Sequence, residues 1–167
     1  MKINLDLDED ASISSDIVLS DNASLDLANG KQLNVTKVFE IPQNLKMEMI
    51  GSGGGTITLA DAMNITGILH FSSPDYNVNN GKIKLNGGSI IDVDYRTIIN
   101  SDIIMQGNTT IDIVQGATLE YRGEAVDLLD YQLTFLGDGT LLNGNAILLT
   151  SAGSLIVFTG DTTIALI

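Results

Sequence analysis

A short phrase recurs along the chain and constrains its fold more than any other feature. Three clear copies, at 107–111, 137–141 and 160–164, combine a turn pair, a small residue, Thr and an aliphatic residue. Self-similarity at a fixed period indicates a solenoid, in which each repeat buries its apolar face against its neighbours. The final aliphatic residue of the clear and looser copies marks the repeats at intervals of 32, 26, 28, 30 and 23, at Leu25, Ile57, Ile83, Ile111, Leu141 and Ile164.

The strand pattern agrees with this architecture. Apolar and polar residues alternate over short segments such as 45–49, 82–85 and 132–135, and Asn-Gly pairs separate many of them. Alternation with period two is typical of β-strands, and Asn-Gly favours tight turns. We therefore predict an all-β fold: a single-stranded parallel β-helix of about six coils, with three short strands per coil. Residues 1–167 would form this one domain, in preference to an antiparallel sandwich.

Three local expectations follow from the same pattern. The segment 64–71 follows a loop and predicts one strand of the coil, whereas 124–129 predicts a short helical turn. The strand pattern begins at Ile3 and continues to Ile167, so both ends of the β-helix are predicted to be uncapped. An uncapped solenoid end exposes strand edges, which favour association. We therefore expect a homo-oligomer, either a trimer or an end-to-end assembly.

The charge balance excludes some partners. There are 21 acidic and 8 basic residues, so the net charge of −13 opposes binding to nucleic acid or to anionic membranes. The longest apolar run, 146–158, is too short to cross a bilayer, and the start lacks the hydrophobic block of a signal peptide. We expect no membrane insertion and synthesis in a cytoplasm without an export signal.

The clearest polar group comes from aligning two coils at an offset of 28 residues. This alignment puts Asp92 beside Glu120 and Asp94 beside Arg122. Two adjacent carboxylates could share a proton, bind Ca²⁺ or act as an acid/base pair on a glycan, although a solvated acidic face is the simpler interpretation. Two tyrosines beside them could stack on sugar rings. The candidate binding residues are Asp92, Asp94, Tyr95, Glu120, Tyr121 and Arg122.

No catalytic residue, cofactor or metal site is predicted from the motifs. Repeats typical of calcium-binding rolls are missing, so Ca²⁺ has no motif to support it. His70 is the single histidine and there is no cysteine, which argues against a structural zinc site. His70 is therefore predicted to be a surface histidine or one satisfied within a loop.

The phrase Gly-Asp/Asn-Gly/Thr-Thr-Ile/Leu, with its Asn-rich turns, resembles the right-handed parallel β-helix of pectate-lyase-like proteins and phage tailspikes. The resemblance covers most of the chain and implies fold more than function. For so short a chain it implies a virion spike, fibre or decoration module, a class in which three helices often pack side by side. Bactofilin-like cytoskeletal solenoids are a second small β-helix class with uncapped ends.

These expectations give one leading function and two alternatives. The leading one is a non-enzymatic structural or binding module of a virus particle, homotrimeric, in contact with other virion proteins and with host glycans. The first alternative is a polysaccharide-degrading enzyme with Asp92 and Glu120 as its acid/base pair. The second is a self-polymerising scaffold joined coil end to coil end.

Overall fold

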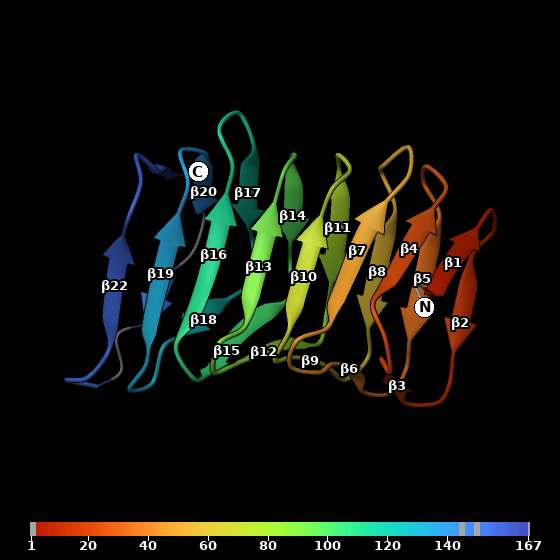
Figure 1. The fold of residues 1–167 in the computed structure, drawn as a ribbon, viewed down its shortest axis with the longest axis horizontal. Coiled ribbons are helices and arrows are strands. Elements are labelled where there is room, and N and C mark those ends of the chain that lie inside the picture. Colours follow the sequence, from red (N-terminus) through yellow and green to blue (C-terminus); the bar gives the residue numbers. More distant parts are fainter. Residues whose placement is uncertain (1–2, 144–145, 149–150, 167) are drawn as a thin grey trace.

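The chain forms a parallel β-solenoid, as Figure 1 shows. The structure is a computed structural model that describes residues 3–143, 146–148 and 151–166. These residues form 23 strands and no helix, and the chain passes through three strands in each coil. The predicted all-β solenoid with three strands per coil is therefore confirmed, with about seven coils in place of six.

Each strand of a coil belongs to its own parallel sheet. Sheet A holds β1 (Ile3–Leu7), β4 (Ala23–Leu27), β7 (Lys46–Ile50), β10 (Ile68–Phe71), β13 (Ile90–Val93), β16 (Thr109–Ile113), β19 (Gln132–Leu136) and β22 (Leu155–Phe158). Sheet B holds β2 (Ala11–Ile13), β5 (Gln32–Val35), β8 (Thr56–Leu59), β11 (Tyr76–Asn79), β14 (Thr97–Ile99), β17 (Thr118–Tyr121), β20 (Thr140–Asn143) and β23 (Thr163–Leu166). Sheet C holds β3 (Ile17–Val18), β6 (Phe39–Ile41), β9 (Ala62–Ile65), β12 (Lys82–Asn86), β15 (Asp102–Gln106), β18 (Ala125–Asp127) and β21 (Ala146–Leu148).

The coils are shorter than the phrase predicted. Residues that lie side by side in neighbouring coils are 20 to 24 positions apart in the sequence. The markers Ile57, Ile83 and Ile111 lie in sheets B, C and A respectively. The phrase describes a turn followed by a strand, which occurs three times in every coil. Its spacing therefore does not measure the coil.

Two local expectations also change. The segment 64–71 is divided between β9 and β10 by a corner at Thr66 and Gly67. The segment 124–129 contains the strand β18 in place of a helical turn, because Val126 is buried against the core and pairs with Ile103. Tertiary packing has outweighed the local helical tendency of this short segment.

Along most strands, alternate side chains point into the solenoid. On β10, for example, Leu69 and Phe71 are fully buried while Ile68 and His70 face outward. Stacked coils bring Leu69 beside Met47 and Ile91, so the core is a continuous column of apolar side chains. Each buried aliphatic or aromatic side chain contributes about 1.5–3 kcal/mol, which makes this column the main source of stability.

A buried tyrosine ties two coils together at the corner between sheets A and B. Tyr76 is fully buried, and its hydroxyl accepts a hydrogen bond from the Leu27 N–H at 3.0 Å. The same hydroxyl donates to the Ile50 carbonyl at 2.6 Å. Leu27 and Ile50 end β4 and β7, so Tyr76 satisfies backbone groups where two successive strands leave sheet A.

The corner between β9 and β10 leaves no room for a side chain. A Cβ atom on Gly67 would lie 2.2 Å from the Leu45 carbonyl oxygen and 2.3 Å from that of Pro42. Gly87, at the equivalent corner of the next coil, has no such neighbour: its Cβ would meet only the Gly107 Cα, at 3.9 Å. Close approach of the backbone therefore requires glycine at the first corner and permits alanine at the second.

Exposed apolar side chains gather at the two ends of the solenoid. Leu5 and Val18 are exposed in the first coil, and the final strands expose Leu155, Phe158 and Ile164. In the described part of the chain no helix covers either end. Among the described residues there is also no helix that could cross a membrane.

We predict that Gly67→Ala lowers the free energy of unfolding by about 1–3 kcal/mol, because the added methyl group must displace backbone of the preceding coil. Gly87→Ala is the matched control and should change it by less than about 0.5 kcal/mol. Urea denaturation of both variants measures the difference. Equal stability of the two would contradict the close packing at the Gly67 corner.

Tyr76→Phe should lower the free energy of unfolding by about 1–3 kcal/mol, because it leaves the buried Leu27 N–H and the half-buried Ile50 carbonyl without their hydroxyl partner. Tyr95, whose side chain is exposed, provides the control Tyr95→Phe, which should be neutral. Thermal unfolding followed by circular dichroism compares the two variants. A Tyr76→Phe protein as stable as its control would mean that the hydroxyl adds nothing to this corner.

Candidate functional site

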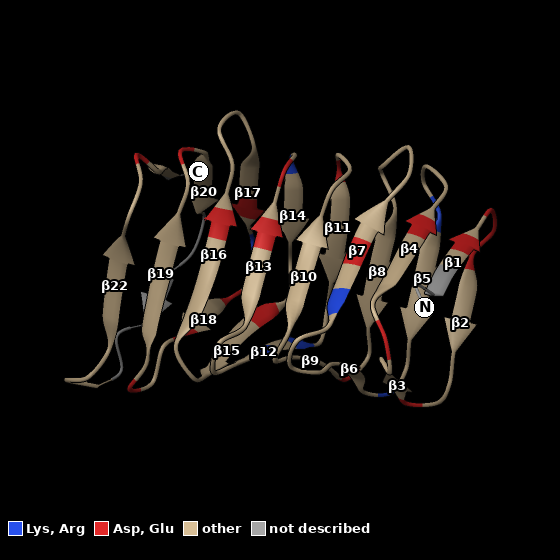
Figure 2. Ribbon diagram, viewed as in Figure 1, with Lys and Arg blue, Asp and Glu red and all other residues tan. Residues whose placement is uncertain are grey.

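Ionisable side chains line one register position on the outer face of sheet A. Glu48, His70, Asp92 and Asp112 are successive neighbours on β7, β10, β13 and β16, and we call them the sheet A row. Neighbouring strands of a sheet lie about 4.8 Å apart, so each side chain is within reach of the next. Figure 2 shows the acidic segments on β7, β13 and β16 in the same sheet.

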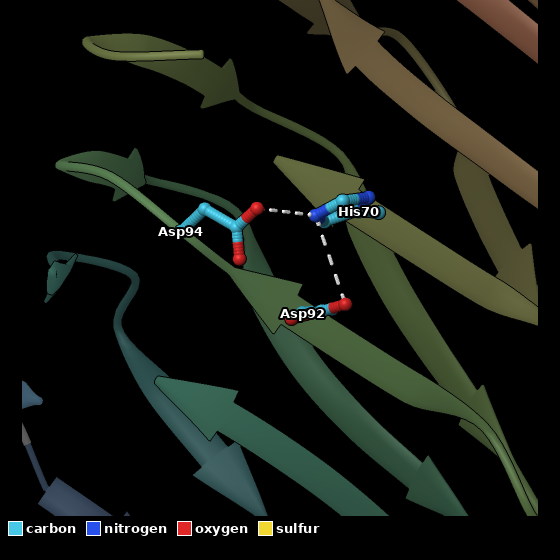
Figure 3. A group of neighbouring side chains, drawn as sticks. All are labelled: His70, Asp92 and Asp94. Atoms are coloured by element: carbon cyan, nitrogen blue, oxygen red, sulfur yellow. Dashed lines mark hydrogen bonds and ion pairs between the residues drawn. The ribbon is translucent and has the colours of Figure 1, made fainter. Parts of the chain in front are cut away.

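His70 is the centre of this row. Its Nε2 lies 2.9 Å from Asp94 Oδ2 and 3.7 Å from Asp92 Oδ2, as Figure 3 shows. On the other side of the ring, Nδ1 lies 3.2 Å from Lys46 Nζ and 3.5 Å from Glu48 Oε1. Only 12% of the His70 side chain is exposed. Both ring nitrogens therefore face charged groups on a largely covered surface.

The carboxylates of this surface are crowded. Burial raises the pKa of Asp92; His70 and Lys46 oppose the rise, whereas Asp94 and Asp112 add to it. Burial also raises the pKa of Asp112, and the charge of Asp94 raises it further. Ionisation of Asp92 and Asp112 is thus less favourable than in solution, and a cation placed among these carboxylates would be attracted.

The predicted pairing of Asp92 with Glu120 is wrong. Asp92 lies beside Asp112 in sheet A, whereas Glu120 lies beside Ile98 in sheet B. The prediction used an offset of 28 residues, and the coils between these positions have 20 to 22. The same error placed Asp94 beside Arg122, although Asp94 bonds to His70.

Glu120 belongs to a separate group at sheet B, the Glu120 cluster of Asp75, Arg96, Glu120 and Arg122. The two carboxylate oxygens of Glu120 accept hydrogen bonds from Arg96 Nη2 at 2.8 Å and from Arg122 Nε at 2.7 Å. Arg96 also donates to Asp75 Oδ1 at 2.8 Å. Burial, the largest single influence, acts to raise the pKa of Glu120, but the two arginines together hold it below its ordinary value. Glu120 therefore stays ionised and paired.

The two candidate tyrosines have different environments. Tyr95, in the turn between β13 and β14, has 49% of its surface exposed and offers a ring to solvent. Tyr121 is 2% exposed, and its hydroxyl donates to the Ala125 carbonyl. Burial raises the pKa of Tyr121. Tyr121 therefore packs in the core, and the prediction that it could stack on a sugar ring is wrong.

His70 is the functional candidate that sequence reasoning missed. It was predicted to lie at the surface or in a loop, but it lies on β10 with one ligand atom each from His70, Asp92 and Asp94 within 4.8 Å of one another. Such a set of nitrogen and oxygen atoms can hold a metal ion. The signal that could have revealed it is the spacing of Glu48, His70 and Asp92, which is 22 residues in each step.

We predict that Glu120→Gln lowers the free energy of unfolding at pH 7 by about 1–2 kcal/mol, because two charge-assisted hydrogen bonds weaken beside half-exposed arginines. The pKa of Glu120 is lowered by folding, so its contribution is present above its unfolded value, near 4.5, and is lost as the pH falls through the folded value. The difference from the native protein should therefore shrink between pH 7 and pH 3. Urea denaturation at both pH values measures it, with the exposed Glu124→Gln as control. A difference that stays constant with pH would exclude the ion pairs as its source.

No protein-family model, curated protein or solved structure matches this chain. The parallel β-solenoid is thus established by the strand pairing, and the resemblance to a particular β-helix family rests on the repeated phrase alone.

Proposed function

We propose that this chain is a non-enzymatic structural and binding module, a rigid rod within a larger assembly. The observation that supports it is the uninterrupted stack of coils: all three sheets and one apolar core run along the described chain. In a solenoid each coil contacts only its neighbours, so length and stiffness increase with every coil. The fold is therefore suited to holding surfaces apart in a fixed orientation.

The proposed setting is a virus particle, as a spike, fibre or decoration protein that forms a homotrimer. The support is the resemblance of the repeated phrase, together with apolar residues exposed at both ends of the rod, such as Val18 and Phe158. Exposed strand edges and apolar side chains are usually covered by further protein. Of the two tyrosines predicted to contact a host glycan, only Tyr95 is accessible for this role.

A head-to-tail filament is the second candidate. The strands of a parallel solenoid all run in one direction in each sheet, so the edge of the last coil can pair with the edge of the first coil in another copy. The exposed Leu155 lies on β22, the outermost strand of sheet A at one end. Such a contact is heterologous and can repeat without closing.

The acid/base pair predicted for a polysaccharide-degrading enzyme is not formed. Such an enzyme would require Asp92 and Glu120 to act as an acid/base pair across one sugar bond, but these residues belong to different sheets. Glu120 is also held by two arginines.

We expect light scattering after size-exclusion chromatography to give three times the 17.7 kDa chain mass over a range of concentrations. Side-by-side packing of three rods would bury apolar side chains exposed on the flank of the rod, such as Leu136 on β19. A species that remains monomeric at the highest soluble concentration would exclude the homotrimer.

Light scattering and negative-stain microscopy of two variants separate a trimer from a filament. Leu155→Lys puts a charge on the terminal strand, where it should block edge pairing. Tyr95→Lys is the control, because Tyr95 is as exposed as Leu155 but lies between β13 and β14, in the middle of the stack. A filament seen by negative-stain microscopy should disappear only in the first variant, whereas a side-by-side trimer should persist in both.

A further inference from the structure

We propose that His70, Asp92 and Asp94 form a binding site for one divalent transition-metal ion of the Zn²⁺ type. The inference is independent of the proposed structural role, since it depends only on the outer face of sheet A. It starts from a mixed set of donors, one imidazole nitrogen and two carboxylates, each within 4.8 Å of the others.

The spacing of the donor atoms fits a single ion. Ligand atoms bound to Zn²⁺ at about 2.0–2.2 Å in tetrahedral geometry are about 3.4 Å from each other. His70 Nε2 lies 2.9 Å from Asp94 Oδ2 and 3.7 Å from Asp92 Oδ2, on either side of that value. Asp92 and Asp94 offer oxygens within 4.8 Å of each other, so these two carboxylates must rotate toward each other to hold the ion.

The backbone holds these donors firmly. His70 and Asp92 are direct register neighbours on β10 and β13, two strands in the middle of sheet A. The Asp94 N–H donates to the Phe71 carbonyl at 3.1 Å, which extends the pairing of the two strands up to the third donor. Sites built on paired strands keep their geometry better than sites on loops.

A third carboxylate, outside the donor set, lies beside the other nitrogen of the histidine ring. If Nε2 binds the ion, the neutral ring carries its proton on Nδ1. Glu48 Oε1 lies 3.5 Å from Nδ1 on the opposite side of the ring, where it can accept that proton's hydrogen bond. Histidines that bind metals usually donate their other N–H to a carboxylate or carbonyl in this way.

The donor set also selects the ion. Imidazole nitrogen suits Zn²⁺, Ni²⁺, Cu²⁺ or Fe²⁺, whereas Ca²⁺ and Mg²⁺ prefer sites made only of oxygen atoms. Three protein donors leave the outward side of the ion open to water, because His70, Asp92 and Asp94 all come from one sheet face. Asp112 adds negative charge next to Asp92 and strengthens the attraction.

One residue opposes the ion. Lys46 Nζ lies 3.2 Å from His70 Nδ1, where it favours a proton on Nε2, and its positive charge repels a cation. The Lys46 side chain is 36% exposed, so it can move aside when an ion binds. Removing its charge should therefore strengthen binding, an effect opposite to that of losing a ligand.

The test is isothermal titration of the native protein with Zn²⁺, together with the visible absorption of bound Co²⁺ as a measure of coordination. We expect one ion per chain. His70→Gln and Asp94→Asn should each weaken Zn²⁺ binding by about 100-fold, and Glu48→Gln by about 10-fold. Lys46→Gln should strengthen it, by up to about five-fold.

Controls separate this site from general attraction to an acidic surface. Asp61→Asn removes an exposed carboxylate away from sheet A and should leave Zn²⁺ affinity unchanged. Circular dichroism verifies that each variant remains folded. The proposal is overturned if Zn²⁺ does not bind, if Ca²⁺ binds equally well, or if folded His70→Gln and Asp94→Asn bind Zn²⁺ like the native protein.

Discussion

Hydrogen bonding between successive coils is the interaction on which the rest of this structure depends. Each strand pairs in parallel with the equivalent strand one coil away, so the paired strand residues lie beside defined partners. Because side chains alternate between the two faces of a strand, a slip of one residue would turn the whole core outward. The apolar column therefore fixes the register, and the register in turn decides which polar side chains meet on the surface.

The strand register has opposite effects in the Glu120 cluster and in the sheet A row. In the Glu120 cluster, arginines from two coils neutralise a nearly buried carboxylate, and its pKa falls. In the sheet A row, carboxylates from neighbouring coils lie beside each other, and the pKa of Asp92 rises. The first group is compensated by its own neighbours. The second retains an excess of negative charge around one imidazole, which is why we regard it as the place where an outside ion would be accepted.

The fold class could be predicted from the sequence, but the candidate site could not. The number of residues per coil explains both results. Alternation and Asn-Gly turns predict short strands and tight corners wherever they occur, and these local rules needed no coil length. Each predicted contact between surface side chains, in contrast, depended on the coil length. An offset of 28 paired Asp92 with Glu120, whereas the true offsets of 22 and 20 bring Asp92 to His70 and Asp112. Tyr121 was misplaced for another reason: once Leu119 points inward, strand alternation also sends Tyr121 inward.

Each coil of the solenoid contacts only its neighbours, and this determines where local unfolding begins. A terminal coil is held from one side and a middle coil from two, so spontaneous fraying should begin at β1 and β22 and travel inward. His70 and Asp94 belong to coils near the centre of the stack, farthest from both fraying edges. The coils that hold His70 and Asp94 are thus the last to unfold, and the arrangement of these side chains is kept longest.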